Sequence, residues 1–227
     1  MNIISTKNGF TPDHSSTSYE FLAVDKALGK KERAAVGSLS RRANPTSRRV
    51  SFIYHVDGYD IPGGWISLLE KYYDVMYRED YDWWTLAIAF NTSPEQIDQL
   101  TRYEFDNDEG SVIEISTAGN RVIVIINCRV DFSCLEESFY ENDDDNDDED
   151  EEEQDEPGAG FASDNELLDL LCQVREQLIA GDYRSLYVVW QKYGTSEDED
   201  PEDEAPPVPQ EKETGKNVVE HFFNILA

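Results

Sequence analysis

The chain has 227 residues, with 19 lysines and arginines against 49 aspartates and glutamates, so its formal net charge at pH 7 is −30. This length predicts one domain, or one domain with appendages. The longest apolar run, residues 122–126, is far shorter than the roughly 20 residues that span a bilayer, so no membrane-spanning helix is expected. The excess of negative charge argues against direct binding to nucleic-acid phosphates or to anionic membranes.

The first part of the chain predicts two strands with a short helix between them. Residues 1–18 are polar and without periodicity, so they are expected to form a flexible leader. Residues 19–24 are rich in strand formers, and Asp25 is expected to end that strand and cap a helix over about 30–41. Residues 49–55 alternate apolar and polar side chains, which predicts a strand with one face in the core.

The next segments predict a longer helix, a buried strand and a second helix. Residues 65–78 carry apolar side chains at the i, i+3, i+4, i+7 spacing, which predicts a helix. Residues 84–90 form an apolar strand pattern. Ser93 and Pro94 are typical of a helix start, and Gln96 is placed to complete a capping box.

Strand patterns then recur over 103–106, 112–116 and 121–130, and Gly119-Asn120 between the last two is a hairpin signal. Taken with the earlier strands, the pattern predicts an α+β fold. It would have a mainly antiparallel or mixed sheet of about five strands packed with helices, interrupted by an acidic loop.

Two acidic tracts hold twenty of the 49 acids: residues 141–156 contain thirteen and residues 197–204 contain seven. Runs of this density repel themselves and bury no apolar surface, so both tracts are predicted to be disordered. They are either solvated insertions that keep the protein soluble, or polyanionic arms that bind a basic partner or mimic nucleic acid. A short Gly/Ser linker is expected to replace 141–156 with little effect on folding.

Three helices are predicted after the first acidic tract. The first covers 164–179, with Ser163 as its N-cap and Gly181 after its end, and the others cover 185–193 and 218–226. The expected organisation is therefore a leader (1–18), an α+β domain in two parts (19–140 and 163–194), a disordered acidic loop (141–162), an acidic and proline-rich linker (195–216), and a terminal amphipathic helix (217–227).

Several segments of the chain resemble an uncharacterised bacterial protein family whose members open with a Tyr-Glu-Phe-Leu-Ala-Ile-Asp strand. The resembling segments are Tyr19–Asp25, Leu39-Ser40, Pro45-Thr46, Glu70–Asp74 and Leu178–Tyr187. The resemblance covers about 19–193 without the acidic tract. It implies a prokaryotic cytoplasmic protein, and it implies no activity, because no reaction or site is assigned to that family.

The sequence shows none of the strong motifs of catalysis or of cofactor binding. The histidines at positions 14, 55 and 221 lie in separate segments, so no zinc site is expected, and His55 is expected to have a structural role. Phosphate-binding glycine loops are absent. Three cysteines without a CxxC pair make a disulfide framework improbable and favour a reducing cytoplasm, and the N-terminus carries no recognisable secretory signal. No metal or cofactor is expected.

Three groups of residues are candidate interaction sites. An aromatic group belongs either to the core and its rim or to a partner-binding edge: Tyr77, Tyr81, Trp83 and Trp84. Apolar residues of the terminal helix dock either on their own domain or in a partner's groove: Phe222, Phe223 and Leu226. A basic patch is either solvated or a seat for an acidic arm or partner: Lys30, Lys31, Arg33, Arg41, Arg42, Arg48 and Arg49.

These observations predict a non-catalytic protein-binding or regulatory module of a bacterial cytoplasmic system, with a protein partner, of which a basic protein is one candidate. The alternative is an acidic mimic of nucleic acid, or an accessory protein of a CRISPR-like defence or stress-response system. An enzyme with an unrecognised carboxylate site is the third hypothesis, and a deep pocket with convergent polar groups would support it.

Overall fold

The structure is a computed structural model that describes residues 17–54, 60–80, 83–131, 166–194 and 205–227. Several predictions fall outside these residues: most of the leader, His55, Tyr81, the helix cap at Ser163, the acidic loop, and the acidic part of the linker. Thr17 and Ser18, predicted to belong to the leader, are the first two residues of a strand.

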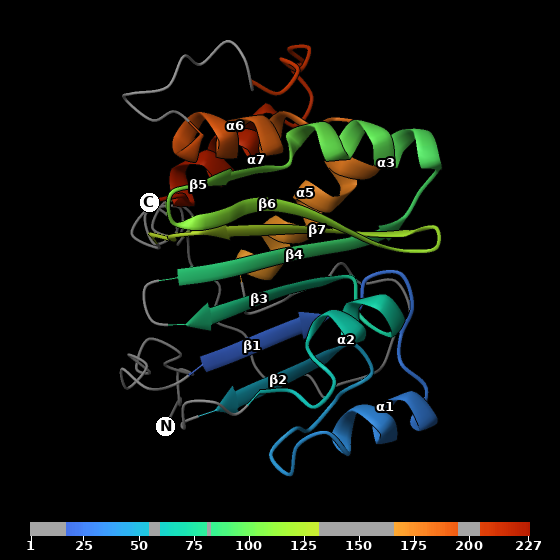
Figure 1. Ribbon diagram of the computed structural model, residues 1–227. Coiled ribbons are helices and arrows are strands. Elements are labelled where there is room, and N and C mark those ends of the chain that lie inside the picture. The colour runs from blue at the N-terminus through green and yellow to red at the C-terminus, as the bar shows by residue number, and fades with distance from the viewer. Residues whose placement is uncertain (1–16, 55–59, 81–82, 132–165, 195–204) are drawn as a thin grey trace, which may run out of the picture.

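The centre of the molecule is one antiparallel sheet of seven strands, so the predicted α+β class is confirmed and the sheet has two strands more than expected (Figure 1). The strands are β1 (Thr17–Leu22), β2 (Arg49–Tyr54), β3 (Val75–Asp80), β4 (Trp83–Asn91), β5 (Phe105–Asn107), β6 (Gly110–Ala118) and β7 (Arg121–Cys128). Their order across the sheet is β2-β1-β3-β4-β7-β6-β5, and each neighbouring pair is antiparallel.

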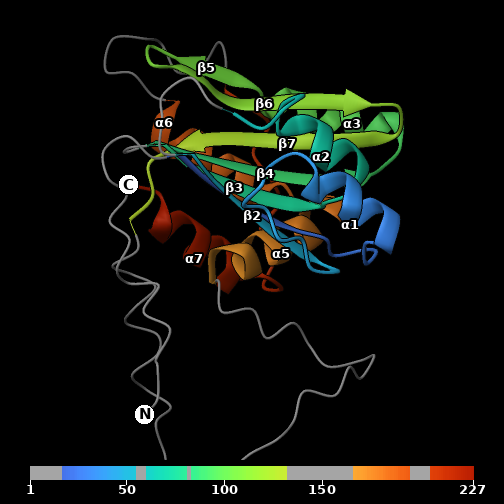
Figure 2. The same ribbon diagram turned by 90° about the horizontal axis from the view of Figure 1, so that it is seen from below.

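Helices cover both faces of the sheet. They are α1 (Lys30–Gly37), α2 (Ile66–Lys71), α3 (Pro94–Leu100), α5 (Glu166–Ile179), α6 (Arg184–Tyr193) and α7 (Lys216–Ile225), with a 3₁₀ turn over Thr101–Tyr103. Helices α1 and α2 lie on one face, and α5 and α7 lie on the other (Figures 1 and 2). Because strand side chains alternate between faces, β4 sends Leu86 and Ile88 into one core and Ala87 and Ala89 into the other.

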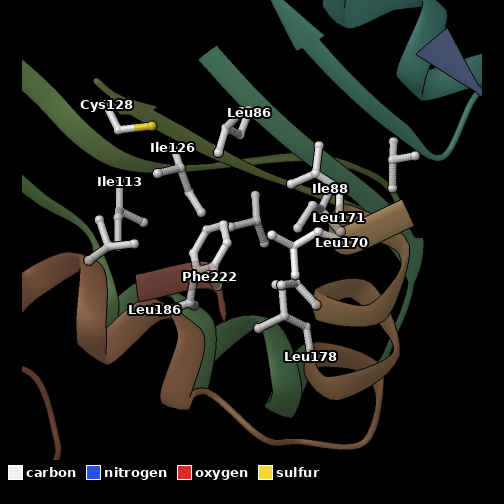
Figure 3. Close-up of a cluster of buried hydrophobic side chains, with 14 of the residues drawn as sticks. Leu86, Ile88, Ile113, Ile126, Cys128, Leu170, Leu171, Leu178, Leu186 and Phe222 are labelled. Carbon is white, nitrogen blue, oxygen red and sulfur yellow. The ribbon is translucent and has the colours of Figure 1, made fainter. Parts of the chain in front are cut away.

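The larger core lies between the sheet and the C-terminal helices. Figure 3 shows strand residues such as Leu86 and Ile126 meeting Leu171 of α5, Leu186 of α6 and Phe222 of α7. These five side chains are fully buried. Strand residues before the acidic loop and helix residues after it therefore share one apolar cluster, and the later helices complete the domain.

The helix predicted over 65–78 is wrong in its second half. Helix α2 stops at Lys71, and Val75 begins β3, which pairs with β1 on one side and β4 on the other. Val75 and Met76 are both fully buried although they point to opposite faces. A central strand covered on both faces gives a continuous apolar run, and such a run also matches helical spacing.

Two predicted helix starts had different outcomes. Asp25 does not cap α1, which begins after Gly29, whose N–H donates to the Glu32 carboxylate at 2.6 Å. The cap of α3 is confirmed, since Ser93 Oγ accepts a hydrogen bond from the N–H of Gln96 at 3.3 Å. The Gln96 side chain does not close a capping box but donates to the carbonyl oxygen of Leu178.

The remaining predictions of local structure hold with shifted boundaries. Helix α1 ends at Gly37 rather than near residue 41. The turn at Gly119-Asn120 joins β6 to β7, with Gly119 at a φ of 66°. Gly181, at a φ of 71°, ends α5, and its N–H donates to the carbonyl oxygen of Leu178. The segment predicted as a helix over 185–193 is α6.

Candidate functional site

One end of the sheet holds a network of four charged side chains. The Asp74 carboxylate is 2.8 Å from the Arg121 guanidinium and 3.9 Å from that of Arg175. Arg175 in turn lies 2.5 Å from Asp25. Asp74 and Arg175 are each only 4% exposed. Burying charge is costly unless it is paired and hydrogen-bonded, so the network either supports the fold or serves a site.

The hydrogen bonds of this four-charge network favour the structural role. The second oxygen of Asp74 accepts from the backbone N–H groups of Val24 and Asp25, at 2.7 and 2.9 Å. Arg121 also donates to backbone carbonyl oxygens of Leu69 and Tyr73, and Arg175 donates to that of Ala89. The charges therefore join the end of β1 to α2, β3, β4, β7 and α5.

A pocket of about 300 Å³ opens beside the network. Its wall includes Asp25, Lys71, Asn91 and Arg121. The carboxylates and guanidinium groups of the network already have partners in the chain, so they offer a ligand few unsatisfied contacts. We therefore assign this end of the sheet to stability.

The opposite end of the sheet carries a second pocket, of about 360 Å³, which we call the Trp83 pocket. It lies where β3 and β7 end and where β4 and β6 begin (Figure 1). Its lining residues are Arg78, Asp80, Trp83, Trp84, Thr85, Asn107, Glu109, Gly110, Ser111, Val112 and Asn127. This wall combines an aromatic ring, planar amides and charges of both signs.

Hydrogen bonds fix part of the wall of the Trp83 pocket. The Thr85 hydroxyl donates to the Asn127 side-chain oxygen at 2.9 Å, and the Asn127 amide donates to the carbonyl oxygen of Ser111 at 2.9 Å. These bonds cross from β4 through β7 to β6. Most of the pocket wall therefore lies on hydrogen-bonded strands, with Glu109 in the turn between β5 and β6, which favours a preformed binding surface.

Two ion pairs border the Trp83 pocket. Arg78 pairs with Asp80, and both side chains are 30% exposed. The Arg129 guanidinium lies over the Trp83 ring, 5.3 Å from its centroid, and 3.6 Å from the Glu109 carboxylate. The side chains of Arg129 and Glu109 are each 53% exposed, so their attraction is strongly screened by water.

The structure separates the predicted aromatic group into core and surface. Trp84 is buried and packs against Tyr77, with ring centroids 5.4 Å apart. Trp83 is half-buried at the pocket, and Tyr81 lies outside the described residues. Arg129 and Glu109 were not among the residues predicted from the sequence: Arg129 lies over the Trp83 ring, and Glu109 pairs with Arg129. No local pattern in the sequence joins these three residues.

The terminal helix docks on its own domain, so the candidate role of Phe222 and Leu226 in partner binding is not available in this conformation. Phe222 is fully buried among α5, α6 and the sheet, and Leu226 is 2% exposed and forms a bridge with Val130. Phe223 is 40% exposed, with the Lys192 ammonium 5.6 Å from its ring centroid. Apolar burial in the shared core explains this self-docking.

The predicted basic patch is spread over α1, the turn that follows it and the start of β2. Four of its side chains are exposed and three are half-buried, and the exposed ones are Lys30, Lys31, Arg41 and Arg42. Arg48 has a structural role, because its guanidinium donates to the carbonyl oxygens of Ala23 and Val24 at 2.9 Å.

The described residues offer little evidence for a nucleophilic thiol or for a metal site. Burial raises the pKa of Cys172 to about 12 and raises that of Cys128 further, so both thiols stay protonated near neutral pH. No group of three or more potential metal-ligating side chains occurs in the described part of the chain. No helix in that part is both long and apolar enough to cross a bilayer.

Comparisons with known proteins give little further guidance. No protein-family model matches this sequence, and a search of curated proteins gives no match. Among solved structures, the chain is similar to the ligand-free regulatory subunit of aspartate kinase from Thermus thermophilus. The identity is 14%, the match covers 50% of this chain and 83% of that chain, and the TM-score is 0.22. A TM-score this low supports no conclusion about this chain.

Proposed function

We propose that this chain is a non-catalytic binding module that docks a protein partner at the Trp83 pocket. The observation that carries the proposal is the half-buried Trp83 ring on a rigid, polar sheet end, beside Arg129. Tryptophan and arginine are the residues most enriched among those that dominate protein–protein binding energy. A cytoplasmic, bacterial setting belongs to the proposal and follows from the sequence resemblance and the cysteine content.

The shape of the pocket favours a partner over a reaction. The pocket is open, and Arg78 in its wall and Arg129 at its border each already face a carboxylate of the same chain. Side-chain contacts with a docked segment fit this surface better.

Site-specific photo-crosslinking tests the proposal. A photoreactive residue replaces Ser111 in the pocket wall of the full chain, and a matched one replaces Ser51 on the exposed side of the edge strand β2. In cells of the producing organism, we expect one protein to crosslink at position 111 and not at position 51.

The same experiment with Trp83→Ala separates specific docking from proximity. We expect that substitution to abolish the crosslink while the far-UV circular dichroism spectrum stays unchanged. A crosslink that persists in the variant, or the absence of any crosslinked protein at position 111, would contradict docking at this pocket.

The acidic nucleic-acid mimic rests on the two acidic tracts alone. Both tracts lie outside the described residues, so this second function stays a prediction from composition.

A further inference from the structure

We propose that the Trp83 pocket receives a lysine or arginine side chain of a basic protein partner, and that Arg129 occupies the place of that cation in the free chain. This inference rests on the proposed function and adds the chemistry of the partner. It follows from three features of the pocket: a cation already seated on the ring, carboxylates beside it, and a backbone that lets the resident side chain leave.

The first feature is the geometry of the resident cation. The Arg129 guanidinium lies 5.3 Å from the centroid of the Trp83 ring, within the roughly 6 Å at which a cation is attracted to the face of an indole. The same guanidinium is 3.6 Å from the Glu109 carboxylate. The ring and the carboxylate therefore already form a cation site, and an arginine or lysine of another protein has the chemistry to fill it.

The second feature is the ease of exchange. Because the side chains of Arg129 and Glu109 are each 53% exposed, water screens their attraction, and exposed pairs of this kind contribute little to stability. Asp80, which accepts a hydrogen bond from Thr17 and pairs with Arg78, supplies a second carboxylate in the pocket wall. An incoming cation can thus replace the weak contact of Arg129 with Glu109 by a similar contact of its own. The other contacts between the partner and this chain then add to the binding free energy.

The third feature is that the backbone of Arg129 is held by the C-terminal segment and α6, and not by the Trp83 ring. Its carbonyl oxygen accepts from the N–H of Ala227 at 3.0 Å and from the Tyr193 hydroxyl at 3.2 Å. The next residue, Val130, bridges to Leu226. The Arg129 side chain can therefore swing off the ring with its backbone still fixed, so binding requires no unfolding of the terminal segment.

Overall charge supports a basic partner rather than an acidic one. The chain carries a net charge of −30, which attracts cations and repels anions over long range. This attraction is nonspecific, since the acidic tracts draw any basic peptide. The specific part of the inference is the contact with the Trp83 ring, which a change of ring tests without altering the net charge.

Peptide titration of the full-length chain tests the inference. The probe is a fluorescent, end-capped peptide of alternating arginine and glycine, and its binding is followed by anisotropy at low and at physiological salt. We expect Arg129→Ala to tighten binding about 2- to 5-fold, because the peptide no longer displaces a resident cation from the ring. Adding Trp83→Ala to this variant is expected to remove the gain.

Two controls isolate the contact. Arg102→Ala removes an exposed cation from the 3₁₀ turn and changes the net charge equally, so it measures the purely electrostatic gain. Trp65→Ala removes a half-buried tryptophan beside α2, in the other core, and is expected to leave binding unchanged. A peptide with uncharged citrulline in place of arginine is expected to bind all the variants with the same affinity.

The inference is overturned if Arg129→Ala tightens binding no more than Arg102→Ala does, or if Trp83→Ala leaves the gain intact. Should Trp83→Ala lower the cooperativity of unfolding, Trp83→Phe provides the test, because it keeps a ring with weaker cation attraction and is expected to retain part of the gain. If Trp83→Ala abolishes the crosslink from position 111 but peptide binding ignores the ring, the docking proposal stands and the basic chemistry fails.

Discussion

The two ends of the sheet use the same kinds of charged residues in opposite ways. At one end, Asp74 and Arg175 are almost completely buried, and their partners are other charges and backbone groups of several elements. At the Trp83 end, the side chains of Arg129 and Glu109 are half exposed, and Arg129 lies between the Trp83 ring and the Glu109 carboxylate. Burial and hydrogen bonding, rather than residue type, decide that the first end supports the fold and the second remains open to a partner.

The difference also shows which charged residues are candidates for binding and which are structural. A buried, fully paired network is usually structural, and removing one member leaves another charge without a partner. An exposed pair contributes roughly 0–1 kcal/mol and is free to exchange partners. Substitutions at the two ends should therefore separate stability from binding.

The largest effect is expected for Asp74→Ala. This change leaves Arg121 and Arg175 without their shared carboxylate, so we expect a loss of roughly 3–5 kcal/mol in the free energy of unfolding, measured by urea denaturation. Asp74→Asn keeps the shape of the side chain and an acceptor for the backbone N–H groups, so its loss should be smaller. A loss below about 1 kcal/mol for Asp74→Ala would refute the anchoring role.

The next effect concerns the support behind the Trp83 end. Leu226→Ala removes a buried side chain from the apolar cluster against which Val130 packs, and we expect a loss of about 2–3 kcal/mol in the free energy of unfolding. Phe223→Ala, three residues earlier in α7 and 40% exposed, is the control and should cost less than about 1 kcal/mol. Equal losses for the two variants would show that α7 is not packed as described.

An ion pair near the terminal segment should give an intermediate effect. Burial acts to raise the pKa of Asp182, but hydrogen bonds and the charge of Arg184 outweigh it and lower the pKa below its ordinary value of 3.8. Arg184 also donates to the carbonyl oxygen of Thr214, so the pair holds the segment that leads into α7. We expect Asp182→Asn to cost about 1–2 kcal/mol at pH 7.

The pH dependence checks the sign of that effect. Because the folded-state pKa of Asp182 is lowered, its stabilisation is complete above the ordinary value of 3.8 and is lost as pH falls through the folded-state pKa. The difference in unfolding free energy between the wild type and Asp182→Asn should therefore shrink on acidification. A difference that grows below pH 4 would contradict the assignment.

The smallest effect is expected at the Trp83 end itself. Asp80→Ala breaks a pair with Arg78 in which both side chains are 30% exposed, so the loss in unfolding free energy should stay below about 1 kcal/mol. The same variant should weaken crosslinking at position 111 if Asp80 contacts the partner. A large loss of stability here would remove the contrast between the two ends.

Local signals in the sequence determined much of the secondary structure. The alternation in 49–55, the Ser93-Pro94 helix start, the hairpin turn at Gly119-Asn120 and the helix end at Gly181 all depend on neighbours within a few residues, and all appear in the structure. The α+β class followed from the same signals. Such features need no knowledge of distant contacts, because backbone geometry and capping hydrogen bonds are local.

Only the tertiary structure decided the fate of residues 72–78 and of Asp25. The pairing of β3 with two strands overrides a helical spacing, because a ladder on both sides and burial on both faces stabilise the strand. Asp25 lies three residues after the end of β1, and its carboxylate pairs with Arg175, which is 150 residues away. Nothing within a few residues of Asp25 indicates that partner.

The candidate site divides in the same way. The sequence drew attention to Trp83 through its cluster of aromatic residues, and its composition drew attention to a basic partner. It did not separate the half-buried Trp83 from the buried Trp84, nor did it place Arg129 on the ring or Glu109 beside Arg129. Adjacent residues in a strand point to opposite faces of the sheet. What packs on each face therefore determines which of the two tryptophans is buried. Contacts between distant segments exist only once the sheet has formed.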